Sequence, residues 1–269
     1  MKRILSLILA VMFVVCCFAG CNTGKPEETT APEVKDEAPA LKTVEKGKLI
    51  MATNAAFAPY EFKEGEEFKG IDVEIAQAVA AKLGLTLEIK DMNFDTLLNV
   101  VNEKKADIVL AGLTVTPDRQ KEVDFSISYA SGVQSIIVTE DSEITSVDDL
   151  LAEGATYIAG VQLGTTGDTY ATDDMGEDRV YRYVNGNEAV LSLLKGEIQC
   201  VIIDNEPAKK YLDANPGKGL KILDTSYIEE DYAAAFAKGN DELRKAVDKA
   251  IEELIADGTV DNIIKKYIK

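Results

Sequence analysis

The sequence predicts an α/β protein that is built from two lobes. Its 269 residues are about twice the length of an ordinary single domain, so two folding units are the first expectation. Short apolar runs alternate along the chain with segments of helical periodicity, and this alternation is typical of α/β folds with mostly parallel sheets. Apolar residues make up 46% of the chain, which is enough to form a sizeable core.

The predicted strands are short apolar runs that end at polar or turn-forming residues. The first covers residues 49–53 and ends before Asn54. The strand 199–203 contains Cys200, which we interpret as a buried core residue because no candidate base flanks it. The other predicted strands cover residues 85–89, 107–111, 134–138, 156–161, 179–184 and 232–236.

The predicted helices are segments in which apolar side chains recur every three or four residues. Residues 72–83 show this spacing, and Gly84 marks the end of the helix. Another helix is predicted to begin at Thr116 and Pro117, with the threonine as its cap and the proline in its first turn. The remaining predicted helices cover residues 94–101, 187–195, 206–214, 242–256 and 260–267.

The N-terminal segment combines basic charge, a short apolar run and small residues before a cysteine. The apolar run 4–18 has the length of a signal sequence rather than that of a transmembrane helix. Ala19-Gly20-Cys21 resembles the bacterial lipobox, in which the cysteine receives lipid and becomes the new N-terminus. We therefore predict a signal peptide over residues 1–20 and a lipidated Cys21 that opens an extended, proline-containing tether over residues 21–43. An ordinary signal peptide would leave this tether unexplained.

The composition excludes several classes of function. The chain contains no histidine, so it cannot form a Ser-His-Asp or Cys-His relay or a zinc site of the HExxH or Cys/His type. Its 47 acidic and 29 basic residues give a net charge of −18. This charge argues against a nucleic-acid partner and against electrostatic binding to an anionic membrane surface. No metal ion and no cofactor is expected.

Polar residues follow several predicted strands at the point where each strand ends. In open α/β sheets, ligands bind beyond the carboxyl ends of the strands. The segments that occupy these positions are residues 54–60, 112–114, 162–167 and 204–206. The sequence therefore predicts that these four segments contribute to one ligand site.

Two motifs resemble those of a known family. Residues 70–75, Gly-Ile-Asp-Val-Glu-Ile, and residues 111–116, Ala-Gly-Leu-Thr-Val-Thr, followed by Asp118 and Arg119, are similar to the signature of the bacterial extracellular solute-binding proteins, family three. The resemblance extends over residues 49–268. Proteins of this family are the amino-acid-binding components of ABC importers. The resemblance implies a periplasmic-binding-protein-like fold of type II, in which two α/β lobes are joined by two hinge strands with a ligand cleft between them.

The resemblance also implies how this chain is divided and what it contacts. Lobe 1 would cover residues 44–131 and 229–269 and lobe 2 residues 132–228, with hinges near residues 131–134 and 227–232. We expect a monomer whose partners are a free amino acid, the permease subunits of an ABC transporter and, through its lipid anchor, the membrane. The protein would be exported and held at the outer face of the cytoplasmic membrane.

The implied site binds both charged ends of a free amino acid. Arg119 would hold the carboxylate with its planar guanidinium group. Asp204 would pair with the ammonium group, and a helix cap is its alternative role. Free amide groups of a helix opened by residues 164–166 would supplement carboxylate binding. The implied ligand-binding residues are Asn54, Phe57, Tyr60, Phe94, Ala111, Gly112, Thr114, Arg119, Gln162, Thr165, Thr166 and Asp204, and no residue is assigned a catalytic role.

The lining of the site indicates which amino acid to expect. Phe57, Tyr60 and Phe94 would enclose the ligand side chain as aromatic walls. In the family, glutamine and basic-amino-acid binders commonly carry aspartate at the position of Asn54, and glutamine binders can carry lysine at that of Gln162. Two neutral amides favour a hydrogen-bonding, polar side chain and give less reason to expect a strong preference for a cation. Gln162 and the Thr165-Thr166 pair, however, also resemble arginine-binding relatives. The expected ligand is therefore a polar L-amino acid that is glutamine- or arginine-like.

The leading interpretation is the substrate-binding component of an ABC importer, which is not an enzyme. It would capture the amino acid by hinge closure and deliver it to a membrane permease. The alternative is an enzyme on the same fold, of the dehydratase or lytic type, which would need a further general acid or base such as Glu206. An amino-acid sensor without transport also stays open.

Overall fold

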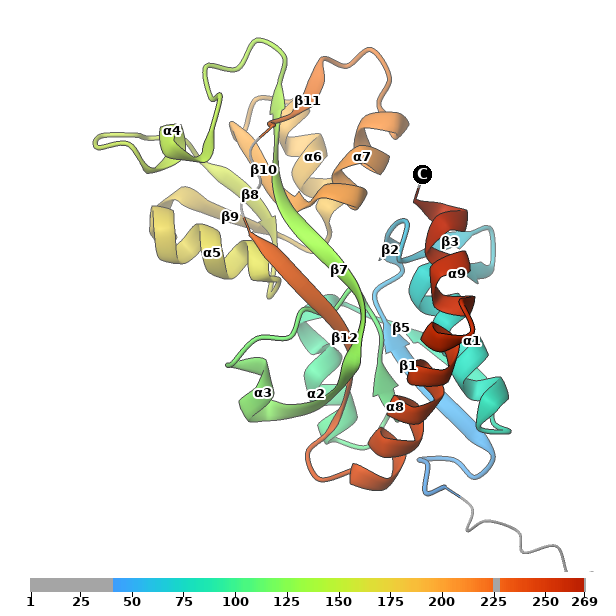
Figure 1. Cartoon of the computed structure of the whole chain (residues 1–269). Helices are drawn as coiled ribbons and strands as arrows, with labels where there is room; N and C mark the ends of the chain where they lie inside the picture. Colours follow the sequence, from blue (N-terminus) through green and yellow to red (C-terminus); the bar gives the residue numbers. More distant parts are fainter. Residues whose placement is uncertain (1–40, 225–227, 269) are drawn as a thin grey trace, which may run out of the picture. The chain divides into compact units, whose positions relative to one another are not determined.

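The computed structural model describes residues 41–224 and 228–268 (Figure 1). The predicted signal peptide, the predicted lipidation site Cys21 and the predicted tether up to residue 40 lie outside these residues. Every strand and helix that the sequence predicts has a counterpart in the structure. Within the described part, no helix is both long and apolar enough to cross a bilayer.

One nine-stranded sheet runs through the described part of the chain, with helices packed against it (Figure 1). In spatial order its strands are β5 (Thr86–Asp91), β1 (Lys48–Thr53), β6 (Ile108–Val109), β12 (Glu229–Ala237), β7 (Val123–Thr139), β10 (Cys200–Asp204), β8 (Ala159–Gln162) and β9 (Val180–Tyr183), and β11 (Leu220–Ile222) pairs with β7. Strand β1 is parallel to β5 and β6, and β8 is parallel to β9 and β10. The prediction of mostly parallel pairing is wrong at the centre, because β7 and β12 are antiparallel to all their partners.

Strand β7 links the two halves of the sheet. Its residues 123–133 pair with β12, and its residues 134–139 pair with β10 and β11. Figure 1 shows β7 and β12 running side by side through the middle of the fold. The hydrophobic pattern predicted only residues 134–138, because aspartate and serine residues interrupt the apolar pattern in the first part of this 17-residue strand.

The helices connect the strands of the sheet. They are α1 (Ile71–Lys82), α2 (Leu97–Asn102), α3 (Arg119–Glu122), α4 (Val147–Leu151), α5 (Thr166–Met175), α6 (Gly186–Leu194), α7 (Asn205–Ala214), α8 (Asp241–Ala256) and α9 (Thr259–Tyr267), with 3-10 turns at Phe94–Thr96 and Glu177–Arg179. Helix α3 begins later than predicted, yet the Thr116 hydroxyl accepts a hydrogen bond from the Arg119 amide at 3.2 Å, as a capping threonine does. Helix α4 and the small sheet of β2 (Ala56–Phe57), β3 (Glu61–Glu64) and β4 (Glu67–Lys69) were not predicted, because such short elements show no clear period.

Buried apolar side chains hold the helices against the sheet. Around β8 and β10, the residues Val161, Cys200 and Ile202 are at most 1% exposed. Cys200 is therefore the buried core residue that its sequence context predicts. Burial raises the pKa of its thiol to about 12, so this cysteine stays in its unreactive thiol form.

Gly70 allows the start of α1 to pack against the backbone that enters β3. Its φ of 124° is one that residues with a side chain rarely adopt. A Cβ atom at this position would overlap the carbonyl group of Tyr60. The Asp72 amide donates to the same carbonyl at 2.9 Å. A glycine at position 70 therefore brings the first turn of α1 next to Glu61.

We predict that Gly70→Ala lowers the free energy of unfolding by about 2–5 kcal/mol, since backbone strain and overpacking act together. Gly65→Ala is the control, because Gly65 also has a positive φ, 64°, but a Cβ there meets no atom within 4 Å. This variant should lose only about 1–2 kcal/mol. Equilibrium urea unfolding measures both losses, and equal losses would show that the clash with Tyr60 contributes nothing.

Candidate functional site

The carboxyl ends of strands from both halves of the sheet meet at one cavity. Its volume is about 290 Å³, including a part that is open to solvent. Asn54 follows β1 and Gly112 follows β6, whereas Gln162 ends β8 and Asp204 ends β10. This is the place at which open α/β sheets bind ligands.

The structure brings together eleven of the twelve predicted ligand-binding residues. Those that line the cavity are Asn54, Phe57, Phe94, Ala111, Gly112, Thr114, Arg119, Gln162, Thr165, Thr166 and Asp204. Tyr60 is the exception. Its ring stacks on that of Phe57 with the ring centroids 5.8 Å apart, and its hydroxyl donates to the Ser131 carbonyl at 3.4 Å. Tyr60 thus supports the aromatic wall from behind and does not line the cavity.

Arg119 enters the cavity from the first turn of α3. Its guanidinium group donates to the Thr114 carbonyl at 2.9 Å and to the Gly164 carbonyl at 3.1 Å. Its central carbon lies 5.5 Å from the centre of the Phe94 ring, which is a cation–π contact. Burial lowers the pKa of Arg119 and nearby carboxylates oppose this effect, so the group keeps its charge. A guanidinium carries five N–H donors, so donors remain for an anionic group in the cavity.

The amides of Asn54 and Gln162 are bonded to each other. Gln162 Nε2 donates to Asn54 Oδ1 at 2.9 Å and to the Val184 carbonyl at 3.1 Å. Asn54 Nδ2 donates to the Met92 carbonyl at 2.8 Å. The amide nitrogens are therefore committed to protein acceptors. What the pair offers a ligand is its oxygen atoms, Gln162 Oε1 above all, which accepts no hydrogen bond from the described residues.

Asp204 is buried at the end of β10, with 8% of its surface exposed. It occupies the N-cap position of α7, but its side chain makes no capping hydrogen bond, so the alternative role as a helix cap is wrong. Its carboxylate instead accepts hydrogen bonds from Gln134 Nε2 at 2.9 Å and from the Tyr232 hydroxyl. Burial and the neighbouring Glu230 carboxylate raise the pKa of Asp204 to about 7. A cation beside Asp204 would therefore stabilise its ionised form.

Glu230 is a second buried carboxylate at the site, and it was not predicted. It is 6% exposed, and its Oε2 accepts hydrogen bonds from the Thr114 hydroxyl and from Gln134 Nε2, both at 3.1 Å. Gln134 therefore bridges Glu230 and Asp204. The run Glu229-Glu230-Asp231 is typical of a solvated segment, so the sequence does not indicate that Glu230 is buried at the site. The usable signal is that Glu230 and Tyr232, two residues apart, share one face of strand β12.

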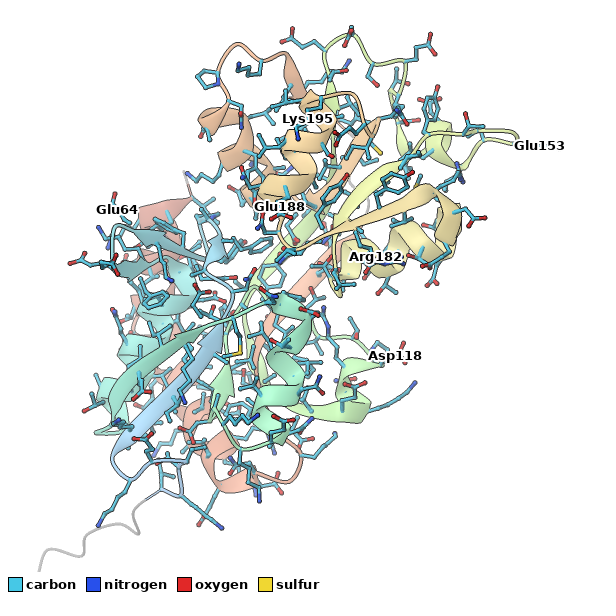
Figure 2. The ribbon with its side chains drawn as sticks, turned by 180° about the vertical axis from the view of Figure 1, so that it is seen from behind. Glu64, Asp118, Glu153, Arg182, Glu188 and Lys195 are labelled. Atoms are coloured by element: carbon cyan, nitrogen blue, oxygen red, sulfur yellow. The ribbon has the colours of Figure 1, made fainter. Side chains whose placement is uncertain are left out.

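Asp168 in α5 holds the loop that carries Gly164 and Thr165. Its carboxylate accepts hydrogen bonds from the Gly164 amide at 3.0 Å and from Arg182 Nε at 2.8 Å. Its own amide donates to the Thr165 hydroxyl at 3.2 Å, which caps the helix. Figure 2 labels Arg182 beside the ribbon of α5. The helix predicted to open at residues 164–166 is therefore confirmed, and an ion pair fixes its first turn at the cavity.

We predict that Asp168→Ala lowers the free energy of unfolding by about 1–3 kcal/mol, because the Gly164 amide and the partly buried Arg182 lose a charged acceptor. Asp173→Ala is the matched control on the exposed side of the same helix, and it should change this free energy by less than about 0.5 kcal/mol. Urea unfolding of the ligand-free protein measures both. If the two variants unfold alike, Asp168 does not hold the loop.

The chain resembles extracellular binding proteins of bacteria. Residues 49–269 match the family described as Bacterial extracellular solute-binding proteins, family 3. The Arginine-binding extracellular protein ArtP of Bacillus subtilis (strain 168) is 36% identical over an alignment of 228 residues, and the alignment covers 82% of this chain and 86% of that relative.

Solved structures share the fold. An ancestral arginine-binding protein bound to glutamine has a TM-score of 0.78 at 36% identity, and the likeness covers 83% of this chain and 99% of that one. The ancestral amino acid-binding protein AncCDT-1, a precursor of cyclohexadienyl dehydratase, has a TM-score of 0.76 at 30% identity, over 83% of this chain and 96% of that one. These likenesses confirm the predicted fold class, an α/β fold of the periplasmic-binding-protein-like type II. The chain therefore belongs to the bacterial extracellular solute-binding proteins, family 3.

Proposed function

We propose that this protein is the substrate-binding component of an ABC importer and binds a polar L-amino acid for delivery to a membrane permease. The observation that carries the proposal is a cavity with both a guanidinium, that of Arg119, and a buried carboxylate, that of Asp204, among its lining groups. A free amino acid presents one carboxylate and one ammonium group, which these two side chains match in charge. The similar arginine-binding protein and the arginine-binding ancestor bound to glutamine support this class of ligand.

The charges around the cavity favour a ligand with a cationic side chain. Asp204 and Glu230 are two buried carboxylates, and the charge of Arg119 interacts with both. A zwitterionic ligand would pair its carboxylate with Arg119 and its ammonium group with Asp204, which leaves the charge of Glu230 without a match. An additional positive charge on the ligand would offset the cost of burying the second carboxylate.

The amide pair of Asn54 and Gln162 points to the same preference. Because the amide nitrogens donate to protein acceptors, the pair presents oxygen atoms to the cavity. Oxygen acceptors suit a side chain that is rich in N–H donors. A guanidinium group has five such donors and a primary amide has two. We therefore place arginine first and glutamine second among the ligands of this site.

In this proposal the protein closes on its ligand about two hinge strands. The proposed lobes cover residues 44–131 with 229–269, and residues 132–228. Strands β7 and β12, which pair where Ser131 faces Asp231, connect the lobes. The hydrogen bonds of Arg119 to Gly164 and of Gln162 to Asn54 would join the lobes at the cavity. Opening would break these bonds, and a bound ligand would favour closure.

Binding without catalysis is part of the proposal. An enzyme on this fold would need a general acid or base in addition to the groups that hold the substrate. Glu206, the candidate for that role, does not line the cavity of Arg119 and Asp204, and it forms an ion pair with Lys209 at 2.6 Å. The arginine-binding relative supports a binding role, and the precursor of a dehydratase is itself described as an amino acid-binding protein.

Export and lipid anchoring complete the proposal. The basic and apolar residues before Cys21 and the small residues beside it support a lipidated, exported protein. The prolines of residues 22–43 suit a spacer between the membrane and the binding unit. Anchored at the outer face of the cytoplasmic membrane, a monomer would stay within reach of its permease.

Thermal unfolding with each of the twenty amino acids tests the proposal. A ligand at about 100 times its dissociation constant adds roughly 2.7 kcal/mol to the stability, so L-arginine or L-glutamine should shift the transition clearly and be recovered unchanged. Arg119→Ala and Asp204→Asn should each weaken binding by about tens- to thousands-fold, because one buried ligand charge stays unpaired. Asp173→Ala is the control. A wild-type transition that no amino acid shifts would contradict the proposal.

The affinity for that amino acid should fall as the pH drops below about 7. Asp204 titrates at a pKa of about 7 in the ligand-free structure, and an ammonium group binds its ionised form. Below this pH, binding must release the proton, so the affinity should decrease toward tenfold per pH unit. Calorimetry between about pH 5.5 and pH 8 measures this slope. The affinity of the Asp204→Asn variant should show no such slope. If the affinity of the wild type does not change with pH, Asp204 does not bind the ammonium group.

A further inference from the structure

A pair of buried carboxyl groups lies behind the cavity wall, outside the set of lining residues. Glu61 begins β3 and Asp72 lies in the first turn of α1, and both residues are 0% exposed. Asp72 Oδ2 accepts hydrogen bonds from the Gly112 amide at 2.7 Å and from the Tyr129 hydroxyl at 2.8 Å. Because Gly112 lines the cavity, Asp72 holds part of the cavity wall from behind.

The backbone at Gly112 has little freedom to move. Its φ is 52°, and a Cβ atom there would lie 2.7 Å from Cε1 of Phe57. The chain therefore runs directly against the aromatic wall of the cavity. If the Gly112 amide lost its acceptor, both the backbone and the Phe57 ring that line the cavity would have to adjust.

Glu61 lacks partners if it is ionised. Neither of its oxygens accepts a hydrogen bond from the described residues, and the same is true of Asp72 Oδ1. A fully buried carboxylate without donors is strongly unfavourable. A proton on Glu61 removes the difficulty, because its carboxyl group then donates to Asp72, which lies within hydrogen-bond reach. Burial and the Asp72 charge raise the pKa of Glu61 well above its usual value.

The surroundings of the pair reinforce this protonation. Asp204 and Asp91 also oppose the ionisation of Glu61. The other titratable groups that face the pair are tyrosine hydroxyls, those of Tyr60, Tyr129 and Tyr211. Asp72 has a pKa raised to about 7 by burial, which its bonds to Gly112, Tyr129 and Glu61 only partly oppose. In the described part of the chain, neither carboxyl group has a hydrogen bond from lysine or arginine.

We propose that Glu61 carries a proton at neutral pH and shares it with Asp72, and that this pair positions the Gly112 backbone in the wall of the ligand cavity. Glu61 and Asp72 are thus positioning residues that act through Gly112 and do not touch the ligand. The positioning part rests on the proposed function, because it assigns the cavity to an amino acid. The protonation part does not.

A proton on Glu61 makes the stability of the folded protein depend on pH. The folded protein keeps the Glu61 proton at a pH where the unfolded chain has lost it, so folding takes up a proton and stability falls as the pH rises. At pH values above the ordinary glutamate pKa and below the raised pKa of Glu61 in the folded protein, the unfolding constant should increase toward tenfold per pH unit through Glu61. Glu61→Gln keeps an N–H donor toward Asp72 but has no proton to lose, so this contribution should vanish.

Two measurements on the ligand-free protein test the protonation. Urea unfolding at pH 6, 7 and 8 should show an extra increase of the unfolding constant, toward tenfold per pH unit, in the wild type and in the exposed control Glu66→Gln, but not in Glu61→Gln. Infrared difference spectra between the wild type and Glu61→Gln at pH 7 should contain the carbonyl band of a buried protonated carboxyl group. If the unfolding constants of the wild type and Glu61→Gln change equally with pH and the carbonyl band is missing, the proposal is wrong.

Binding of L-arginine or L-glutamine, whichever stabilises the wild type, tests the positioning. Calorimetry at pH 7 should give Glu61→Gln an affinity within about twofold of the wild type and Glu61→Leu an affinity at least about tenfold weaker. Equal affinities of the wild type and Glu61→Leu would refute the positioning role.

An NMR measurement on the ligand-free protein tests the positioning even if Glu61→Leu fails to fold or no amino acid binds. The Gly112 amide resonance should move on Glu61→Gln substitution, because its acceptor Asp72 exchanges a carboxyl donor for an amide donor. The Gly84 amide, remote from the pair, is the control. An unmoved Gly112 resonance would overturn the link between the carboxyl pair and the cavity, whatever the outcome of the ligand screen.

Discussion

The burial of carboxyl groups beside β7 and β12 is the constraint on which the rest of the structure depends. Asp72, Asp204 and Glu230 are all less than 9% exposed. Neutral groups hold them: tyrosine hydroxyls, the Gln134 amide and the Gly112 backbone amide. Neutral donors satisfy the hydrogen bonds of a carboxylate but do not cancel its charge, so each buried group still requires a proton or a cation nearby.

Asp72 on the one hand, and Asp204 and Glu230 on the other, meet this requirement in different ways. Asp72 does not line the cavity, and in our account a proton on Glu61 stabilises it. Asp204 lines the cavity, so a ligand can supply the positive charge that it and Glu230 need. The uncompensated charge is thus confined to the place that a ligand reaches, and recognition of an ammonium group uses carboxylates that the fold has already desolvated and oriented.

Short-range patterns were sufficient for elements with a clear period, such as α1, and for cavity residues that follow strand ends, such as Asn54 and Asp204. They were not sufficient where a residue's role depends on a distant segment. Glu230 contacts Thr114 across 116 positions of the chain, and its neighbours in sequence are exposed acids. Tyr60 is a second example. The sequence indicates that this aromatic residue lies near the site, but whether its ring faces the cavity or packs behind Phe57 depends on the tertiary fold.

In the proposed complex, one ligand engages Arg119 through its carboxylate and Asp204 through its ammonium group. This arrangement can be tested by calorimetry with the amino acid that binds best and with two of its analogues, one lacking the carboxylate and one with the amino group acetylated. Each analogue should bind at least about tenfold more weakly than the parent, since each leaves one buried charge unpaired. An analogue that binds as tightly as the parent would show that the corresponding side chain does not hold that end of the ligand.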